Sequence, residues 1–267
     1  MPAAANSIYT VFYDSRFGVI DSTTGVYSPI GSLPIPAAAG IAVYANILFA
    51  QSMQGELIVI NPVSGISTVV GSAGLATVSE VFAGAGNGLF EIDSLSNLYR
   101  INPNTGAATM VGPTGLPANN GGWDTSLSDD GTNLYFTAGG AEAVDELYRV
   151  DTTTGRATDL GSTGARSIAG SAIVSASLDL FQYEAGTNHI YSAPLDSTQF
   201  TQGPVLAAQI VDGGAVLDPA DSYSAANSVP ESGAFLLVGL GLIVLGLVRR
   251  NRFAVKDESR NAGHALR

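Results

Sequence analysis

The sequence predicts an all-β fold, a five-bladed β-propeller, followed by a single C-terminal transmembrane helix. Three observations predict this arrangement: the composition, a set of repeated units, and one apolar run near the end of the chain. The chain has 32 Gly among its 267 residues and is rich in Ser, Thr and Val, which favour turns and strands. Charged residues make up only 13% of it, which is too few for a disordered protein.

The repeated units each predict a strand, a turn and a second strand. In each unit an apolar run ends at Asp or Asn, a Thr-Gly or Ser-Gly turn follows, and a second strand ends at Gly. Four clear copies and a degenerate fifth copy span residues 17–33, 57–74, 98–115, 147–164 and 190–206. The turn glycines of the clear copies, Gly25, Gly65, Gly106 and Gly155, are 40, 41 and 49 residues apart. A period of this length indicates a repeat architecture.

The turn within each copy has a physical mechanism. An Asp or Asn side chain at its first position caps the bend, and Gly at its last position adopts the positive φ that closes it. The second and third copies also place Pro directly after the Asn, where its fixed φ suits the turn. We therefore expect the same hairpin turn in each clear copy.

Two further strand candidates precede each copy, which gives four strands per unit. In the fourth unit they are residues 123–131 and 133–140, joined by an Asp-Asp-Gly hairpin turn. Four strands in about 40–45 residues is the size of one propeller blade. The units also resemble blades common in bacterial exported propeller proteins, which supports the architecture but indicates no ligand.

The two ends of the repeat domain, residues 7–224, predict how the ring closes. Residues 7–15 match the second strand of a blade, so the first blade lacks its own first strand. Residues 214–224 resemble that missing strand, and borrowing it would remove an exposed sheet edge. This count gives five blades. Six blades follow if the last segment begins its own blade, and a β-solenoid or a sandwich is the alternative architecture.

A membrane-spanning helix is predicted after the repeat domain. Residues 225–232 are small and polar and form a linker, and residues 233–248 are 16 consecutive uncharged, mainly apolar residues. As a helix this run is about 24 Å long, short of the hydrocarbon core, but flanking Arg side chains can snorkel. Residues 249–267 begin with the basic sequence RRNR, which predicts a cytoplasmic tail and a repeat domain outside the cytoplasm.

Three features in this order carry a family resemblance. They are the motif Val229, Pro230, Glu231 and Ser232, then the apolar run, then the basic cluster Arg249, Arg250 and Arg252. Together they resemble the PEP-CTERM sorting signal of Gram-negative bacteria. The resemblance implies an exosortase-like processing enzyme as partner and delivery to the cell surface or to an extracellular polysaccharide matrix. Two departures are Ser232, where the family usually has Pro, and a tail of 15 residues after the Arg cluster.

A sorted protein also needs an export signal at its other end. Residues 1–6 hold no basic region and no apolar stretch as long as that of a signal peptide. Residues 3–5, three Ala, nevertheless look like the small-residue end of one. We therefore expect that the natural gene begins upstream of Met1 or that the signal was lost.

The charge distribution excludes nucleic acid as a partner. Up to Ser232 the chain has 21 acidic residues, five Arg and no Lys, a net charge of −16, and from Arg249 onward it carries +4. An acidic domain without Lys repels phosphate backbones. The chain also has no Cys, which excludes disulfides, thiolate metal sites and a Cys nucleophile.

Candidate catalytic residues are few. His189 is the only His of the repeat domain, and we interpret it as an imidazole at the edge of a turn. Without a second His, a Cys or a Lys in the domain, a His-rich metal site, a Ser-His-Asp triad and a Lys Schiff base are difficult to build. Trp123 is a candidate platform for a sugar, although packing between blades is the commoner role of such a residue. The glycine-rich segment 84–88 has no helix after it, so we interpret it as a hairpin rather than a phosphate-binding loop.

The carboxylates leave two alternatives open. Asp129–Asp130 and Asp145–Glu146 could supply oxygens to Ca²⁺, although neither pair has the spacing of a calcium loop. An acid pair of a glycosidase could come from Glu91 and Asp93, or from Glu184, because a propeller brings distant residues to one funnel. Turn chemistry explains the first set and nothing local favours the second, so we predict no metal and no cofactor.

The sequence thus predicts a non-enzymatic exported protein whose propeller face binds carbohydrate or protein. The alternative is a secreted propeller enzyme, a polysaccharide lyase or hydrolase that uses carboxylates in its funnel. Three or more carboxylates at one mouth of the ring would favour the enzyme. A funnel lined by Ser, Thr and Ala would favour the binding protein.

Overall fold

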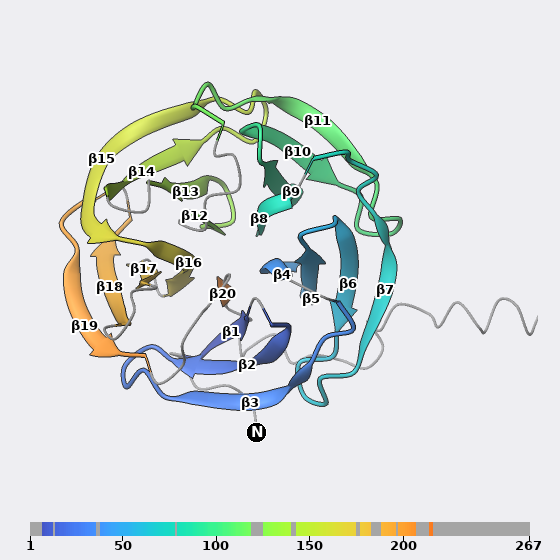
Figure 1. The fold of residues 1–267 in the computed structure, drawn as a ribbon, viewed down its shortest axis with the longest axis horizontal. Helices are drawn as coiled ribbons and strands as arrows, with labels where there is room; N and C mark the ends of the chain where they lie inside the picture. The colour runs from blue at the N-terminus through green and yellow to red at the C-terminus, as the bar shows by residue number, and fades with distance from the viewer. Residues whose placement is uncertain are drawn as a thin grey trace, which may run out of the picture. The chain divides into compact units, whose positions relative to one another are not determined.

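A computed structural model describes ten stretches of the chain, and every described element is a β-strand (Figure 1). The described residues are 7–12, 14–35, 38–77, 79–118, 125–139, 143–174, 177–182, 188–195, 197–206 and 214–215. The chain divides into two units, Met1–Tyr223 and Ser224–Arg267, and all described residues belong to the first.

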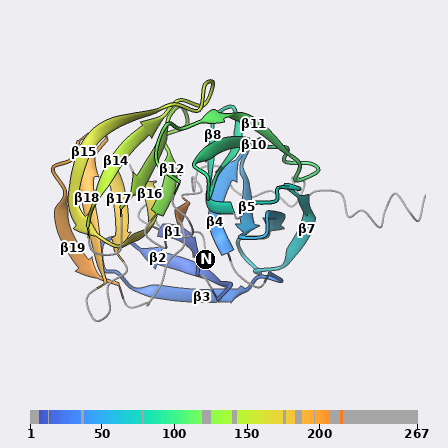
Figure 2. The same ribbon diagram turned by 45° about the horizontal axis from the view of Figure 1, so that its top comes forward.

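The strands form five antiparallel four-stranded sheets around a central axis, with one strand of each sheet innermost and one at the rim (Figure 1, Figure 2). From the axis outward, the first blade consists of β20 (Gly214–Ala215), β1 (Ser7–Val11), β2 (Arg16–Asp21) and β3 (Tyr27–Ser32). The second consists of β4 (Ala38–Tyr44), β5 (Ile47–Ser52), β6 (Glu56–Ile60) and β7 (Ser67–Ser72). The third consists of β8 (Ser79–Ala85), β9 (Gly88–Asp93), β10 (Asn97–Ile101) and β11 (Ala108–Pro113).

The remaining two blades follow the same order. The fourth consists of β12 (Thr125–Asp129), β13 (Leu134–Ala138), β14 (Val144–Val150) and β15 (Ala157–Arg166). The fifth consists of β16 (Ile168–Val174), β17 (Ser177–Gln182), β18 (His189–Pro194) and β19 (Thr201–Val205). The predicted all-β, five-bladed propeller is therefore confirmed, and each repeated unit supplies the two outer strands of a blade.

The ring closes as the ends of the repeat domain predict. β20 pairs antiparallel with β1, with Tyr9 opposite Ala215 and Thr10 opposite Gly214. The last described segment thus completes the first blade instead of beginning a sixth, so the six-bladed count is wrong, as are the solenoid and the sandwich. Closure in this way removes the inner edge that β1 would otherwise expose.

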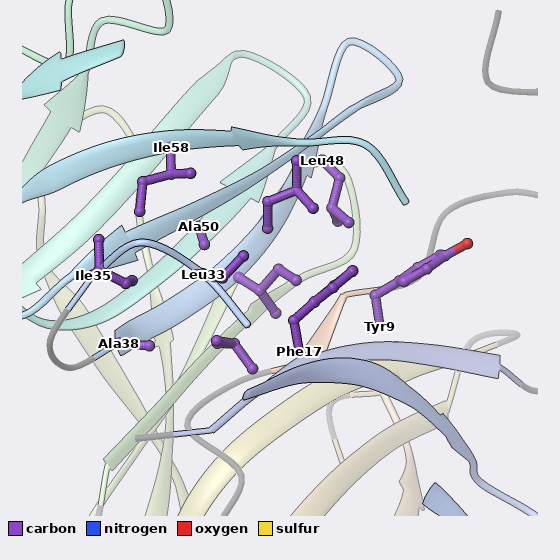
Figure 3. Close-up of a cluster of buried hydrophobic side chains, with 11 residues drawn as sticks. Tyr9, Phe17, Leu33, Ile35, Ala38, Leu48, Ala50 and Ile58 are labelled. Carbon is purple, nitrogen blue, oxygen red and sulfur yellow. The ribbon is translucent and has the colours of Figure 1, made fainter. Parts of the chain in front are cut away.

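The apolar core lies between neighbouring blades. Figure 3 shows the cluster between the first two blades, where Tyr9 and Phe17 of the first face Leu48, Ala50 and Ile58 of the second. These side chains are at most 7% exposed. Burying each large one stabilises the fold by about 1.5–3 kcal/mol. Of the inner strands, β4 and β16 are nearly continuous runs of apolar and small residues, AAGIAVY and IAGSAIV, as expected of strands covered on both faces.

The turn between the third and fourth strands has the predicted chemistry. The Oδ1 atoms of Asp21, Asn61 and Asp151 each accept two backbone N–H bonds of 2.8–3.1 Å. Those bonds lower the pKa of Asp151. The backbone N–H of the turn glycine donates to the carbonyl of the same Asp or Asn, as in the 2.7 Å bond from Gly25 to Asp21. The turn glycines have φ values of 71–81°, which other residues adopt only with strain.

The glycines that end the second and third repeats lie against the turn of the next blade, whereas the atom nearest to a Cβ added to Gly31, in the first repeat, is 4.0 Å away. A Cβ added to Gly71 of β7 would overlap the carbonyl oxygen of Thr105, and one added to Gly112 of β11 would overlap that of Thr154. A Cβ added to Gly25 would overlap the carbonyl oxygen of Val205, where the first and fifth blades meet. At these three junctions, neighbouring blades therefore touch backbone to backbone at the rim, and a side chain larger than that of glycine does not fit.

The predicted C-terminal features lie outside the described residues. These are the linker 225–232, the membrane helix 233–248 and the tail 249–267, and residues 1–6 also lie outside. Within the described part of the chain, no helix has the length and apolar character needed to cross a membrane. The domain boundaries given for these segments stay predictions.

Candidate functional site

The innermost strands of the ring carry mainly small side chains. The buried small residues on the described inner strands are Ala38, Ala39, Gly40 and Ala42 on β4, Ala83, Gly84 and Ala85 on β8, Ser126 and Ser128 on β12, and Ala169, Gly170, Ser171 and Ala172 on β16. A Cβ added to Gly40 would stand 2.9 Å from the carbonyl oxygen of Phe82, on the neighbouring inner strand. The small side chains therefore let inner strands of neighbouring blades approach to backbone contact.

The inner strands of the fourth and fifth blades add hydroxyl groups to this small-residue lining. The hydroxyls of Ser126 and Thr137 are 2.6 Å apart and join β12 to β13. Ser128 and Ser171 are 3% and 1% exposed, and among the described residues their hydroxyls have no hydrogen-bond partner. The inner strands β12 and β16 thus carry buried hydroxyl groups beside larger buried apolar residues such as Leu127 and Ile168.

Glu91 and Asp93, the predicted acid pair, hold the third blade together. Both lie on β9 and are fully buried. The side-chain amide of Gln51 donates a hydrogen bond to Glu91, which joins the second blade to the third. Asp93 accepts backbone bonds of 3.1 Å from Leu95 and 2.8 Å from Asn97, which cap the turn after β9. A further bond of 3.0 Å, from the hydroxyl of Thr77, fixes its second oxygen.

Asp129 and Asp130, one pair of candidate calcium ligands, serve a hairpin turn. Asp129 accepts a 2.9 Å bond from the backbone N–H of Gly131, and burial raises its pKa to about 7. Burial also acts to raise the pKa of Asp130. Hydrogen bonds from Asn133, from the backbone of Thr132 and from the hydroxyl of Tyr135 outweigh it, so the pKa of Asp130 is lowered. The two carboxylates thus occupy different environments within one turn.

Asp145 and Glu146 also divide between two environments. Asp145 is fully buried and accepts a 2.7 Å bond from the backbone N–H of Ile168, which joins the fourth blade to the fifth. Glu146 is only half-buried and lies opposite Ser162 on the neighbouring strand. In the part of the chain that the structure describes, no three His, Asp or Glu residues gather in a way that could hold a metal ion.

His189 begins the third strand of the fifth blade, as the repeat alignment predicts. Its ring nitrogen Nδ1 is 3.3 Å from the carbonyl oxygen of Gly203, and its ring lies edge-on to Tyr191 with centroids 6.4 Å apart. His189 is the first residue of its strand, which agrees with the interpretation as an imidazole at the edge of a turn. Neither of its two contacts aligns it with a Ser or an acidic side chain.

The glycine-rich segment 84–88 is a tight hairpin between β8 and β9, as predicted. The backbone N–H of Gly86 donates a 2.7 Å bond to the carbonyl of Gly131 in the fourth blade. The guanidinium of Arg100 donates to the carbonyl of Asn87 and covers the hairpin. A backbone group of the segment 84–88 therefore makes a contact between blades. The strand β9 follows the segment, so no helix N-terminus is there to hold a phosphate.

The other predicted site residues lie outside the described residues. They are Glu184, Trp123, the sorting motif Val229, Pro230, Glu231 and Ser232, and the basic cluster Arg249, Arg250 and Arg252. Sequence reasoning missed the pairing of Gln51 with Glu91 and the buried hydroxyls of Ser128 and Ser171. No local pattern marks these residues, because their partners lie on other strands or other blades.

Comparisons with known proteins identify the fold and no family. No protein-family model matches the sequence, and no curated protein matches it. Among solved structures, one chain of a crystal structure of a nidogen/laminin complex has a TM-score of 0.54 and 11% identity. The match covers 79% of this chain and 97% of that chain. At this identity the likeness shows the propeller fold alone, and 542 chains match, so the fold does not select a function.

Proposed function

We propose that this chain is a non-enzymatic, exported cell-envelope protein whose propeller binds carbohydrate or protein outside the cytoplasm. The observation that carries the proposal is the order of three C-terminal features: the motif 229–232, the uncharged run 233–248, and the cluster Arg249, Arg250 and Arg252. An exosortase-like enzyme processes the motif, and the propeller then reaches the surface or the polysaccharide matrix. Without processing, the same segment anchors the propeller in the membrane.

The orientation follows from charge. Lys and Arg close to a membrane span stay on the cytoplasmic side, so the basic tail lies inside and the propeller outside. The repeat domain, residues 7–224, has 20 acidic residues and five Arg, a net charge of −15, and then faces the cell exterior. Its surface favours neutral or basic partners, because acidic polymers are repelled at ranges up to the Debye length.

The arrangement of the ring supports a binding role over an enzymatic one. The carboxylates Glu91, Asp93 and Asp145 are each committed to hydrogen bonds that cap turns or join blades. Among the described residues, no three His, Asp or Glu side chains gather closely enough to hold a metal ion. A rigid ring offers a preformed surface for recognition, and such a surface binds a partner at little cost in conformational entropy.

The test follows the C-terminus of the protein in a host that has the sorting enzyme. The natural gene is expressed there, and the surface and membrane fractions are analysed by mass spectrometry. The proposal predicts a mature chain that ends near Pro230–Ser232 and lacks the apolar run. An intact chain ending at Arg267 in the membrane fraction would leave a simple membrane-anchored propeller.

Two matched variants sharpen the result. Glu231→Ala removes the charged residue of the motif and is expected to leave the chain unprocessed. Asn227→Ala, in the same polar linker, is expected to be processed like the natural chain. If both variants are processed equally, the motif has no role in sorting.

The enzymatic alternative is tested on extracellular polysaccharide from the same host. The proposed binding protein retains the polymer on a column without changing its chain length. Appearance of new reducing or unsaturated ends would identify a hydrolase or a lyase. Loss of those ends in a Glu91→Gln variant that still folds would then assign the reaction to this buried carboxyl group.

A further inference from the structure

The inner strands of neighbouring blades meet at two recurring positions. The first lies on the face of an inner strand that points to the next blade, and it holds a small side chain. The second lies on the inner strand of that next blade and holds a large apolar side chain. In the junction of the second and third blades these positions hold Ala42 and Phe82, which belong to one apolar cluster. In the junction of the third and fourth blades they hold Ala83 and Leu127, which also share one cluster.

The junction of the fourth and fifth blades has serine at both positions. Ser128 corresponds to Ala83, since each is paired with an aromatic residue of the second strand of its blade. Ser171 corresponds to Phe82, since each lies three residues before the end of its strand. This junction therefore has two hydroxyl groups where the two preceding junctions have a methyl group and a large apolar side chain.

Both serine side chains face the layer between the fourth and fifth blades. Directly opposite residues of an antiparallel pair share a face of the sheet. Ser128 is opposite Tyr135 on β13. Ser171 is opposite Leu180 on β17, and Tyr135 and Leu180 belong to one buried cluster between the two blades. Because β12 and β16 also pack against each other (Figure 1), the two serines enter this layer from its two sides.

The two hydroxyl groups are buried, and among the described residues they have no hydrogen-bond partner. Native proteins satisfy nearly all such groups, and an ordered water is a common partner where no protein group is in reach. The junction also has room for one. Serine is much smaller than the Phe or Leu of the preceding junctions, and a water molecule takes up only about 30 Å³.

We propose that an ordered water molecule lies in the junction of the fourth and fifth blades and bridges the hydroxyl groups of Ser128 and Ser171. A further partner lies on the same face of β12, where the hydroxyls of Ser126 and Thr137 are 2.6 Å apart. That bond uses one of their two O–H groups, so the other can donate to the water. About three partners are typical of a buried water that is a permanent part of a fold.

Single alanine substitutions distinguish bridged hydroxyl groups from unsatisfied ones by the direction of their effect. If a water bridges the pair, Ser128→Ala and Ser171→Ala each remove one of its partners and should lower the urea concentration at which the full chain unfolds. If the hydroxyl groups are unsatisfied, each substitution removes a destabilising buried polar group and should raise that concentration. A midpoint that is unchanged or raised in either variant would overturn the proposal.

The double variant tests whether the two serines share one water. Ser128→Ala combined with Ser171→Ala should destabilise the chain less than the sum of the single effects, because no hydroxyl of the pair is left without its partner. Ser52→Ala is the control. Its buried hydroxyl accepts a 2.9 Å bond from the backbone N–H of Glu56 in the second blade, so its effect should add to that of Ser128→Ala. Additive effects in both pairs would overturn the proposal.

A second double variant tests the room in the junction. Ser128→Ala combined with Ser171→Leu recreates the side chains of Ala83 and Leu127, and the leucine should displace the water and fill its space. This variant is expected to have a higher Tm than the double alanine variant, because filling a cavity in a core is stabilising. A lower Tm would mean that the junction is too tight for a water, which contradicts the proposal.

A crystal structure of the full chain, at a resolution that shows ordered water, supplies the direct observation. The proposal predicts a water oxygen within about 3 Å of the hydroxyl oxygens of both Ser128 and Ser171. Electron density without a water at this position, or a direct hydrogen bond between the two hydroxyl groups, would overturn it.

Discussion

Asp129 lies at the end of β12, where its carboxylate accepts a hydrogen bond from Gly131 and has little contact with water. Burial raises its pKa from 3.8 to about 7. Between these values the folded chain holds a proton that the unfolded chain has lost, so this group makes stability fall as pH rises from about 4 to 7. Above pH 7 the loss is complete and constant.

Asp129→Asn should therefore stabilise the protein at neutral and alkaline pH. The amide oxygen keeps the bond from Gly131 and carries no charge to desolvate. We expect a gain in the free energy of unfolding of about 1–3 kcal/mol at pH 8, less than the full value of the shift because some solvent contact remains. The gain should shrink as pH falls through 7 and vanish near pH 4, measured by urea unfolding.

Asp159→Asn is the control for this prediction. Asp159 likewise accepts a bond from the backbone two residues on, a 2.7 Å bond from Gly161, but its side chain is exposed on β15. We expect no comparable pH-dependent gain there. If the two variants behave alike, burial is not the cause of the effect at Asp129.

The rim glycines make a second prediction at the scale of single residues. Gly71→Ala should destabilise the protein by about 1–3 kcal/mol, because the added methyl group overlaps the backbone of Thr105 in the next blade. Gly31→Ala changes the equivalent residue of the first blade, where the nearest atom, in Gly65, is 4.0 Å from the new Cβ. Thermal unfolding should show a large decrease in Tm for Gly71→Ala and almost none for Gly31→Ala. Equal decreases would mean that strand propensity, and not the blade contact, explains the glycine.

At the scale of elements, the strands and turns were predictable because their signals are local. The bond that Asp151 accepts from the backbone N–H of Thr154 and the positive φ of Gly155 involve residues a few positions apart, so the repeat displays them directly. The closing strand was predictable for a related reason: the first unit visibly lacks a part that the last segment resembles. In contrast, the bond between Gln51 and Glu91 joins residues 40 positions apart on different blades, and no pattern along the chain encodes it.

The same difference between local signals and long-range contacts explains why the sequence does not show the role of the candidate acid pair. Glu91 and Asp93 invite comparison with a catalytic acid pair, since the sequence shows two carboxylates but not their partners. Only the assembled ring reveals that Asp93 caps a turn and that Glu91 meets Gln51. Residues that carry structural hydrogen bonds and residues that carry chemistry are thus indistinguishable by type alone.

The prediction at the scale of elements concerns β20, because its two residues, Gly214 and Ala215, pair with β1 and close the ring. Ala215→Pro removes the backbone N–H of a residue paired with Tyr9, and proline is poorly tolerated within a ladder. We expect faster hydrogen exchange at the amides of β1 and a loss of about 1–3 kcal/mol in stability. Ala215→Ser keeps the N–H and should leave β1 protected. Unchanged exchange in the proline variant would show that the closing pair contributes nothing to the ring.

At the scale of the whole molecule, the fold and the proposed sorting depend on different parts of the chain. Contacts that recur from blade to blade stabilise the propeller, so its fold follows from the repeat. The proposed sorting of the chain depends instead on the motif 229–232 and on cleavage of the chain near it. Fold and destination can therefore be altered separately by substitution.

Ser232→Pro tests this separation. If the motif is read as the resemblance implies, restoring Pro at its third position should raise the processed fraction of the chain in a host with the sorting enzyme. Thermal unfolding of the propeller should stay the same, because residue 232 belongs to the second unit of the chain. Ser228→Pro, four residues upstream in the same linker, should change neither quantity. A processed fraction that is the same for Ser232→Pro and the natural chain would mean that the residue at position 232 does not control processing.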